Sequence, residues 1–207
     1  MKPAPRFTRA NPEARRQMLV EAARRCLSKG GIAAFTVDQI CKEAGVSRGL
    51  INHYFPNKDD LLVEIYQDSL YKTVNSQIAE ARRHDEGDGP PEFLLKAIVE
   101  ANFAQDYFAR ENLLVWLTLW GEIATNAKLR SAHRLLYESY RKTLAGAIER
   151  VAGARARHVD SAALARAFIA LVDGLWLEWC LDPRAVSTDA ARESCYDLLE
   201  AKLGSLR

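Results

Sequence analysis

Cysteine is scarce in this chain of 207 residues, and the four that occur show no metal-binding or redox pattern. Cys26, Cys41, Cys180 and Cys195 lie far apart, with no C-x-x-C pair and no histidine at ligand spacing. Zinc sites and disulfide frameworks use close, regular spacings of such residues. We therefore expect four reduced cysteines that pack as ordinary side chains, no metal site and no cofactor.

Long apolar runs are also missing. The most apolar stretches, residues 113–124 and 168–181, are shorter than the roughly 20 residues that span a bilayer. They also contain Glu122, Asp173 and Glu178. The first twenty residues are basic and lack an apolar segment, so no secretory signal is expected. These absences predict a soluble, cytoplasmic protein with no membrane partner.

The sequence also lacks the motifs of common enzyme classes. We find no serine nucleophile elbow, no H-E-x-x-H pair and no glycine-rich phosphate loop. Asp173 and Glu178 are five positions apart on an expected helix, so they point about 140° apart and make poor paired carboxylates. The histidines are scattered at positions 53, 84, 133 and 158. We predict no enzyme and no catalytic residue; the alternative is a hydrolase of a cationic substrate.

The composition suits a globular protein with one uneven feature, its charge. Apolar residues make up 48% of the chain and charged residues 27%, which is enough for a buried core. Residues 1–60 hold 11 Lys and Arg against 6 Asp and Glu, whereas residues 61–207 hold 18 against 21. A basic segment of this kind favours contact with phosphate groups, although solvated surfaces often show a similar imbalance.

Apolar residues recur at steps of three and four along most of the chain, and no segment alternates as a strand does. We therefore predict an all-α fold. A loop is expected at residues 84–91, where the sequence is HDEGDGPP. The expected helices cover residues 12–29, 36–44, 47–54, 58–83, 91–109, 111–126, 128–152, 160–181 and 188–205.

Short-range signals mark the ends of the first helices. The glycine pair at 30–31 suits the left-handed conformation that closes a helix. Thr36 and Gln39 have the spacing of a capping box. Gly45 fits a tight turn, and Ser47 is a good N-cap for the helix that follows. Two short helices joined by a three-residue turn form a helix-turn-helix, whose second helix enters the DNA major groove.

The second helix of this motif has one apolar and one polar face. Val46, Leu50, Ile51 and Phe55 form the apolar face, which turns the polar residues at 48, 49, 52 and 53 outward. Arginine pairs well with guanine and asparagine with adenine, so Arg48 and Asn52 are expected to contact bases. Gly49 would allow a close approach of the backbone, and residues at helix ends would contact phosphates. The expected DNA-binding residues are Thr36, Gln39, Ser47, Arg48, Gly49, Asn52, His53, Tyr54 and Lys58.

An ordinary helical hairpin is the alternative, but residues 36–62, TVDQICKEAGVSRGLINHYFPNKDDLL, resemble the DNA-binding signature of the TetR family of repressors. The resemblance covers residues 13–65. It implies an all-helical homodimer that binds a double-stranded DNA operator and a small-molecule effector. We expect a DNA-binding domain at 13–58 with its recognition helix at 47–54, and a ligand-binding and dimerisation domain at 59–207.

Two further expectations concern the dimer interface and the N-terminal arm. The last two helices, at about 160–181 and 188–205, are expected to pair with those of a second copy through Ala167, Leu171, Leu175, Leu198, Leu199 and Leu203. The alternative is that these residues pack within one chain. Residues 1–12 form a basic, proline-containing arm that either enters the minor groove or is a frayed terminus.

Aromatic residues of the second half gather in pairs on helix faces. Trp116 and Trp120 are spaced i, i+4, and Trp176 and Trp179 are spaced i, i+3. Carboxylates such as Asp173 occur among them. Aromatic faces with a nearby carboxylate bind quaternary ammonium ions, which have no N–H to donate. The alternative is that these rings are simply core or dimer packing.

Three segments, ANF at 101–103, VWLTLW at 115–120 and LVDGLWL at 171–177, are similar to the C-terminal domain of BetI-type repressors, which sense choline. The segment Glu178-Trp179-Cys180 departs from that pattern. The resemblance implies a choline-like effector; an unrelated apolar or cationic effector is the alternative, and a protein-binding helical adaptor is a remote one. The implied pocket residues are Trp116, Trp120, Asp173 and Trp176, with Phe103, Tyr107, Glu122, Tyr137 and Trp179 as additions.

Overall fold

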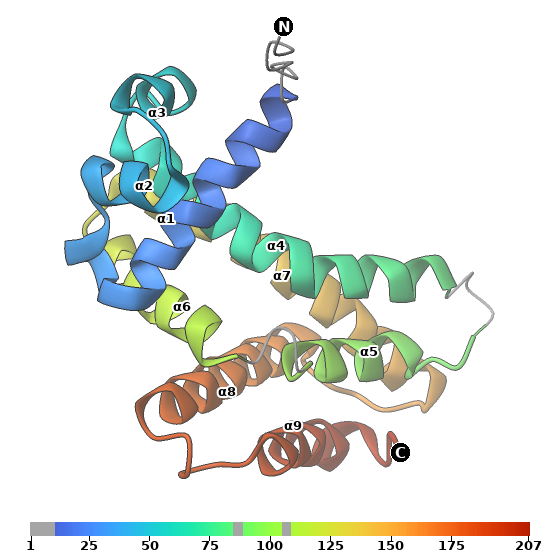
Figure 1. Ribbon diagram of the computed structural model, residues 1–207. Helices are drawn as coiled ribbons and strands as arrows, with labels where there is room; N and C mark the ends of the chain where they lie inside the picture. Colours follow the sequence, from blue (N-terminus) through green and yellow to red (C-terminus); the bar gives the residue numbers. More distant parts are fainter. Residues whose placement is uncertain (1–10, 85–88, 105–108) are drawn as a thin grey trace, which may run out of the picture.

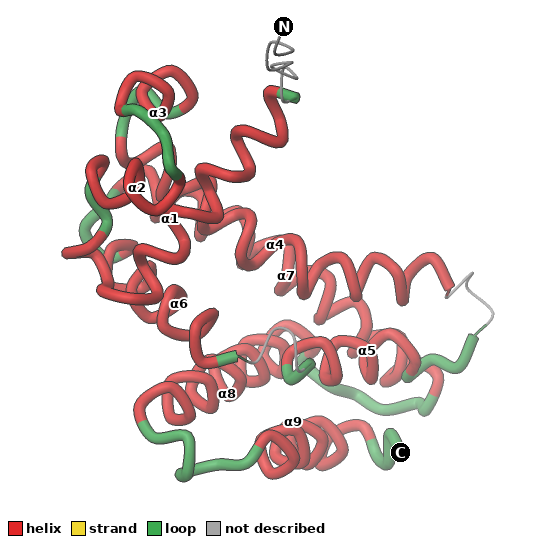
Figure 2. Tube along the Cα trace, viewed as in Figure 1, coloured by secondary structure: helices red, strands yellow, loops and turns green. Residues whose placement is uncertain are grey.

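The computed structural model describes residues 11–84, 89–104 and 109–207. These residues form helices and loops without a strand, which confirms the predicted all-α fold (Figure 2). The helices are α1 (Pro12–Ala34), α2 (Val37–Ala44), α3 (Arg48–Tyr54), α4 (Lys58–His84), α5 (Phe93–Asn102), α6 (Arg110–Ile123), α7 (Ala127–Ala154), α8 (Ser161–Leu181) and α9 (Thr188–Leu203). The expected arm at 1–12 lies almost wholly outside the described residues.

Helices α1, α2 and α3 form a cluster, at the upper left of Figure 1, around one end of α4. Their apolar faces meet in a small core that contains Leu19, Phe35, Ile40, Ile51 and Phe55, all of them buried. Helix α4 has 27 residues, which corresponds to a length of about 40 Å. It extends from this cluster to α5 and α7 and so links the two parts of the protein (Figure 1).

Most short-range signals in the first part of the chain act as predicted. The capping box forms only in its first half, because the Thr36 N–H donates to the carbonyl oxygen of Ala34 and not to the Gln39 side chain. Helix α1 is kinked at the glycine pair, where Gly31 has a φ of 59°, and a short turn continues to Ala34. The backbone N–H of Gln39 donates to the Thr36 hydroxyl at 3.2 Å, and Gly45 is left-handed with a φ of 67°. Ser47 precedes α3 as expected, but its side chain makes no capping hydrogen bond, so that detail was wrong.

The helix expected at 91–109 is shorter in the structure, where α5 covers Phe93–Asn102. The side chain of Asn102 donates a hydrogen bond to the carbonyl oxygen of Ile98 at 2.7 Å and another to the Tyr140 hydroxyl at 2.9 Å. The next backbone N–H, that of Phe103, bonds three residues back to Glu100 instead of four. This tightening ends the helix, and a buried tertiary contact rather than a glycine or proline marks the end.

The remaining helices form a bundle in which α8 lies between α7, α6 and α9. One face of α8 is buried against these neighbours through Phe168, Val172 and Trp176. None of the helices in the described ranges is both long and apolar enough to cross a membrane. All four cysteines are free thiols. Within the same ranges we find no cluster of three potential metal ligands.

Candidate functional site

The outer face of α3 is polar and open to solvent. Arg48, Gly49, Asn52 and His53 are all exposed, whereas Ile51 is buried. Helix α3 lies on the outside of the three-helix cluster (Figure 1), which agrees with the exposure of these residues. This arrangement has the form of a recognition helix, with an apolar face that fixes its position and a polar face for base edges.

One contact on this face was not foreseen. The Arg48 guanidinium forms a bidentate ion pair with the carboxylate of Asp38 on α2, with one N–O distance of 2.6 Å. Both side chains are about two-thirds exposed, so solvent screens the pair and it is weak. The contact holds the Arg48 side chain against α2.

The residues expected at phosphates lie at helix ends close to α3. Thr36 precedes α2 and Lys58 begins α4, and both are exposed. The Lys58 ammonium lies 5.3 Å from the centre of the Phe35 ring. Tyr54, at the end of α3, is half-buried, and its ring packs edge-on against His53. Gln39 and Ser47 are exposed as well, so eight of the nine expected DNA-binding residues are exposed and Tyr54 is half-buried.

Residues 45–49 also have the spacing G-x-S-x-G that a serine nucleophile elbow uses, which the sequence analysis overlooked. That elbow requires a strand before the serine, so that the hydroxyl stands at a sharp strand-to-helix turn. Here α2 precedes the motif and α3 follows it. The motif is therefore the turn of the helix-turn-helix and not a catalytic elbow.

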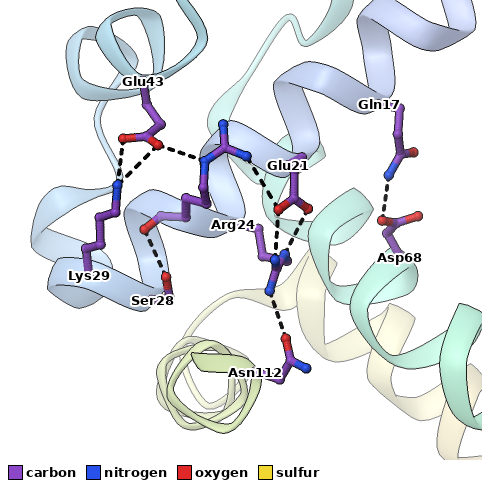
Figure 3. Close-up of polar contacts among 9 residues, drawn as sticks. Gln17, Glu21, Arg24, Ser28, Lys29, Glu43, Asp68 and Asn112 are labelled. Carbon is purple, nitrogen blue, oxygen red and sulfur yellow. Dashed lines mark hydrogen bonds and ion pairs between the residues drawn. The ribbon is translucent and has the colours of Figure 1, made fainter. Parts of the chain in front are cut away.

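A chain of polar contacts links α6 to this DNA-binding cluster (Figure 3). Arg24 on α1 donates to the side chain of Asn112 on α6 at 2.8 Å and also forms two hydrogen bonds with Glu21. Arg25 contacts Glu21 and donates to Glu43 on α2 at 2.7 Å. Polar side chains thus connect α6, α1 and α2 in sequence.

Three tryptophans and one tyrosine form an aromatic cluster that joins α6 to α4 and α8. The ring centre of Trp116 lies 5.6 Å from that of Trp120 and 5.8 Å from that of Trp176 on α8. Tyr66 of α4 packs edge-on against Trp116 at 5.5 Å. The Trp176 indole N–H donates to the carbonyl oxygen of Asn102 at 3.2 Å. Helical spacing indicates the tryptophan pairs but not Tyr66, which lies fifty positions before Trp116, in α4.

A series of contacts connects Tyr66 of this cluster to α7 and then to α8. The Tyr66 hydroxyl lies 2.6 Å from Nδ1 of His133 on α7, and the His133 ring packs against Tyr137 with centres 4.1 Å apart. The Tyr137 hydroxyl donates to both oxygens of Asp173, at 3.2 and 3.3 Å. Since Asp173 and Trp176 share α8, the contacts form a closed circuit through four helices. Burial raises the pKa of Asp173 to about 7, although the Tyr137 hydrogen bond opposes this effect.

The aromatic rings contact one another and leave little space between them. The groove along Trp116, Trp120 and Trp176 has a volume of about 10 Å³, which suffices for about one water molecule. Trp116 and Trp176 are buried and belong to the hydrophobic core. The alternative of core packing is therefore correct for these two rings as they stand, and a ligand would have to separate them.

Sequence comparison identifies two families along the chain. Residues 19–65 match the N-terminal domain of bacterial regulatory proteins of the tetR family, and residues 91–204 match the C-terminal domain of BetI-type transcriptional repressors. The second match alone covers more than half of the chain. The protein is a TetR-family repressor of the BetI type.

Relatives and solved structures agree with this assignment. The BetI 1 regulator of Chromohalobacter salexigens is 31% identical over 193 residues, which cover 91% of this chain and 90% of the relative. A transcriptional regulator of Pseudomonas aeruginosa has a TM-score of 0.83 at 32% identity, over 95% of this chain and 93% of that one. A regulator of Saccharomonospora viridis, solved in complex with choline, has a TM-score of 0.78 at 28% identity, over 92% of this chain and 97% of that one. These relatives are transcriptional regulators, and this TetR-family chain is likewise a DNA-binding regulator and not an enzyme.

Three more of the residues expected at an effector site of this BetI-type domain lie in the described part of the chain, and a fourth does not. Phe103 is buried just after α5, next to Asn102, whose carbonyl accepts from Trp176. Trp179 is half-buried one turn beyond the cluster, and Glu122 is half-buried at the end of α6. Tyr107 lies outside the described residues.

The residues expected at a dimer interface divide into two groups. Leu175, Leu199 and Leu203 are buried within the chain, so the expectation that they face a second copy was wrong. Ala167 is exposed, and Leu171 and Leu198 are half-buried. Helical periodicity located apolar positions but could not tell which of two apolar faces packs inside the chain.

Proposed function

We propose that this protein is a homodimeric repressor that binds a palindromic operator through α3 and releases it when choline or a related quaternary ammonium ion binds at the aromatic cluster. The observation that carries this proposal is the closed circuit of aromatic rings and the half-buried carboxylate of Asp173, which α6 connects to the DNA-binding helices. Operator binding also implies that the protein resides in the cytoplasm with the chromosome.

The exposed face of α3 supports base-specific binding to the operator. Arg48 and Asn52 are one helical turn apart and exposed on the same face, so both can reach base edges in one major groove. Thr36 and Lys58 lie at helix N-termini, where exposed groups can contact phosphates on either side of the groove. Two such faces in a dimer would contact two half-sites about one helical turn apart.

The aromatic cluster supports recognition of a quaternary ammonium ion. Such an ion has a spread positive charge and no N–H, so ring faces bind it better than hydrogen-bond acceptors do. Trp116, Trp120 and Trp176 supply the rings, and Asp173 supplies a negative charge on the helix that carries Trp176. The choline complex of the Saccharomonospora viridis regulator supports the same class of ligand.

Helix α6 supplies a route from the effector site to the DNA-binding helices. Since the rings leave space for about one water molecule, a bound choline must move Trp116 and Trp120, and with them α6. Asn112, one turn before Trp116, is hydrogen-bonded to Arg24 of α1. We propose that movement of α6 breaks this hydrogen bond and shifts α1 and α2. An effector acts in this way only if it binds the shifted conformation more tightly.

The outer face of α8 supports a dimer. An apolar stripe without charges runs along α8 at steps of four and three residues, as in paired helices, and all but the first of its members are exposed. Gly174 lies in this stripe with open space around it, which permits close approach of a second helix. A groove of about 460 Å³ between the start of α8 and the end of α9 is lined by Ala167 and Leu198. The stripe consists of Ala163, Ala167, Ala170, Gly174, Leu177 and Leu181.

Two variants test the division of labour between the sites. The operator is first isolated by selection from random DNA duplexes, and choline binding is followed by tryptophan fluorescence. Asn52→Ala should weaken operator binding by about 1–3 kcal/mol per half-site and leave choline binding unchanged. Trp120→Ala should abolish the response to choline and leave operator binding unchanged. If both variants lose both activities while their melting temperatures are unchanged, the proposed assignment of the two sites is wrong.

A further inference from the structure

Asp173 is a carboxylate in the proposed effector site. Its hydrogen-bond partner is the Tyr137 hydroxyl, and within the described residues no lysine, arginine or histidine forms an ion pair with it. The side chain is half-buried, and it lies where α7 and α8 meet. A buried carboxylate without a counter-ion is costly to ionise, so it tends to remain protonated near neutral pH.

Among the described residues, the titratable groups around Asp173 do not supply that counter-ion. From α7 it faces Tyr137 and, beyond it, His133 and Tyr140; from α4 it faces Tyr66. Burial lowers the pKa of His133, and the nearby positive charge of Arg141 lowers it further, so this ring is neutral at pH 7. Burial raises the pKa of Tyr66 and of Tyr140, and these hydroxyls also stay neutral. The described residues of α6 and α9 add no charge that shifts Asp173.

The geometry points to a proton exchange at this site: a permanently cationic effector binds next to Asp173 and displaces its proton into solvent. The protonated carboxyl group and the free cation become an ion pair and one released proton, so charge and atoms balance. This inference rests on the proposed choline-type effector and adds the basis of its selectivity. The fixed charge of the effector, rather than its shape alone, determines binding.

This exchange distinguishes compounds that have the same trimethylated head. Choline and betaine aldehyde are permanent cations, and each would displace the proton. Glycine betaine carries its own carboxylate, which Asp173 would repel. The compound 3,3-dimethylbutan-1-ol has the shape of choline but no charge, so it would bind the protonated form without releasing a proton. We therefore expect proton release and affinity to follow the charge of the compound.

Titration calorimetry of the full-length protein tests the exchange directly. Choline binding is measured at pH 7 in two buffers with different ionisation enthalpies, which gives the number of protons released. With a free-state pKa of about 7, we expect about half a proton per choline. Between pH 5.5 and pH 8 the affinity for choline should rise about 30-fold, and it should level off above pH 8. The uncharged analogue should show neither effect.

Two variants identify the group that releases the proton. Asp173→Asn keeps a hydrogen-bond acceptor for Tyr137 but cannot ionise, so choline binding should become weaker and independent of pH. Glu178→Gln is the control, because Glu178 is an exposed carboxylate on the same helix. It should retain the wild-type pH profile.

The possible results separate this inference from the proposed function. If choline binds with the same affinity from pH 5.5 to pH 8 and releases no proton, the exchange is refuted and the choline-responsive repressor stands. If Asp173→Asn still releases a proton, another group titrates and the assignment to Asp173 is wrong. If choline does not bind at any pH while the operator does, the proposed effector is wrong, and the exchange fails with it.

Discussion

Replacing Asn112 by alanine tests the proposed route from the effector site to the DNA-binding helices. Asn112 lies one turn before Trp116 on α6, and its side-chain oxygen accepts a hydrogen bond from the Arg24 guanidinium at 2.8 Å (Figure 3). Arg24 in turn is paired with Glu21, so the contact joins α6 to the ion pairs of α1. The substitution removes this hydrogen bond and leaves the aromatic side chains themselves unchanged.

The expected magnitude follows from the type of hydrogen bond. A hydrogen bond from a charged group contributes about 1.5–3 kcal/mol, and coupling between two sites in a protein amounts to about 1–3 kcal/mol. Because the Arg24 side chain is partly exposed, we take the lower end, about 1.4 kcal/mol, which corresponds to a factor of ten. In Asn112→Ala, choline should therefore reduce operator affinity by a factor about ten times smaller than in the wild type. The affinity of the free protein for choline should not fall.

The assay is fluorescence anisotropy of a labelled operator, titrated with protein at zero and at saturating choline. Gln17→Ala is the matched control. The Gln17 side-chain amide donates to Asp68 of α4 at 2.8 Å, so this substitution removes a polar contact between α1 and α4. The control should keep most of the choline effect. The route through α6 is refuted if Asn112→Ala retains the wild-type ratio of the two affinities, or if both variants lose it equally.

Three further predictions concern operator binding, the dimer and stability. The logarithm of operator affinity should fall steeply and linearly with the logarithm of salt concentration, and a flat dependence would rule out phosphate contacts at α3. Ala167→Glu, on the exposed stripe of α8, should shift the protein from dimer to monomer in sedimentation. The control Ala162→Glu, exposed on another face of α8, should remain a dimer. If both variants remain dimers, the proposed interface is wrong. The raised pKa of Asp173 means that the folded state binds more protons than the unfolded state between about pH 4 and pH 7, so stability is lost as the pH rises through this window and is constant above it. Asp173→Asn should therefore be more stable than the wild type at pH 8 by the order of 2–4 kcal/mol in urea unfolding, with little difference at pH 4; equal stabilities at pH 8 would contradict this.

The DNA-binding part was predicted well because its signals are local. Thr36 and Gly45 each control the chain within three residues of themselves, through a cap and a left-handed turn. Such interactions are encoded in a short stretch of sequence. The ion pair between Arg48 and Asp38 was missed, because it joins two helices whose relative angle the sequence does not state.

The aromatic cluster was predicted only in part, because it is assembled from distant helices. The tryptophan pairs of α6 and α8 are visible as spacings, but Tyr66 and His133 come from α4 and α7 and show no pattern that links them. The early end of α5 likewise depends on a buried contact between Asn102 and Tyr140. These features follow from tertiary packing, which overrides local preference.

The central claim is that one effector controls one operator. The most direct measurement is the dissociation constant of the wild-type protein for its selected operator, with and without saturating choline, at constant ionic strength. We predict that choline weakens operator binding by tenfold or more, and that 3,3-dimethylbutan-1-ol at the same concentration does so much less. An operator affinity that choline leaves unchanged, with saturable choline binding seen in the same sample, would contradict the claim.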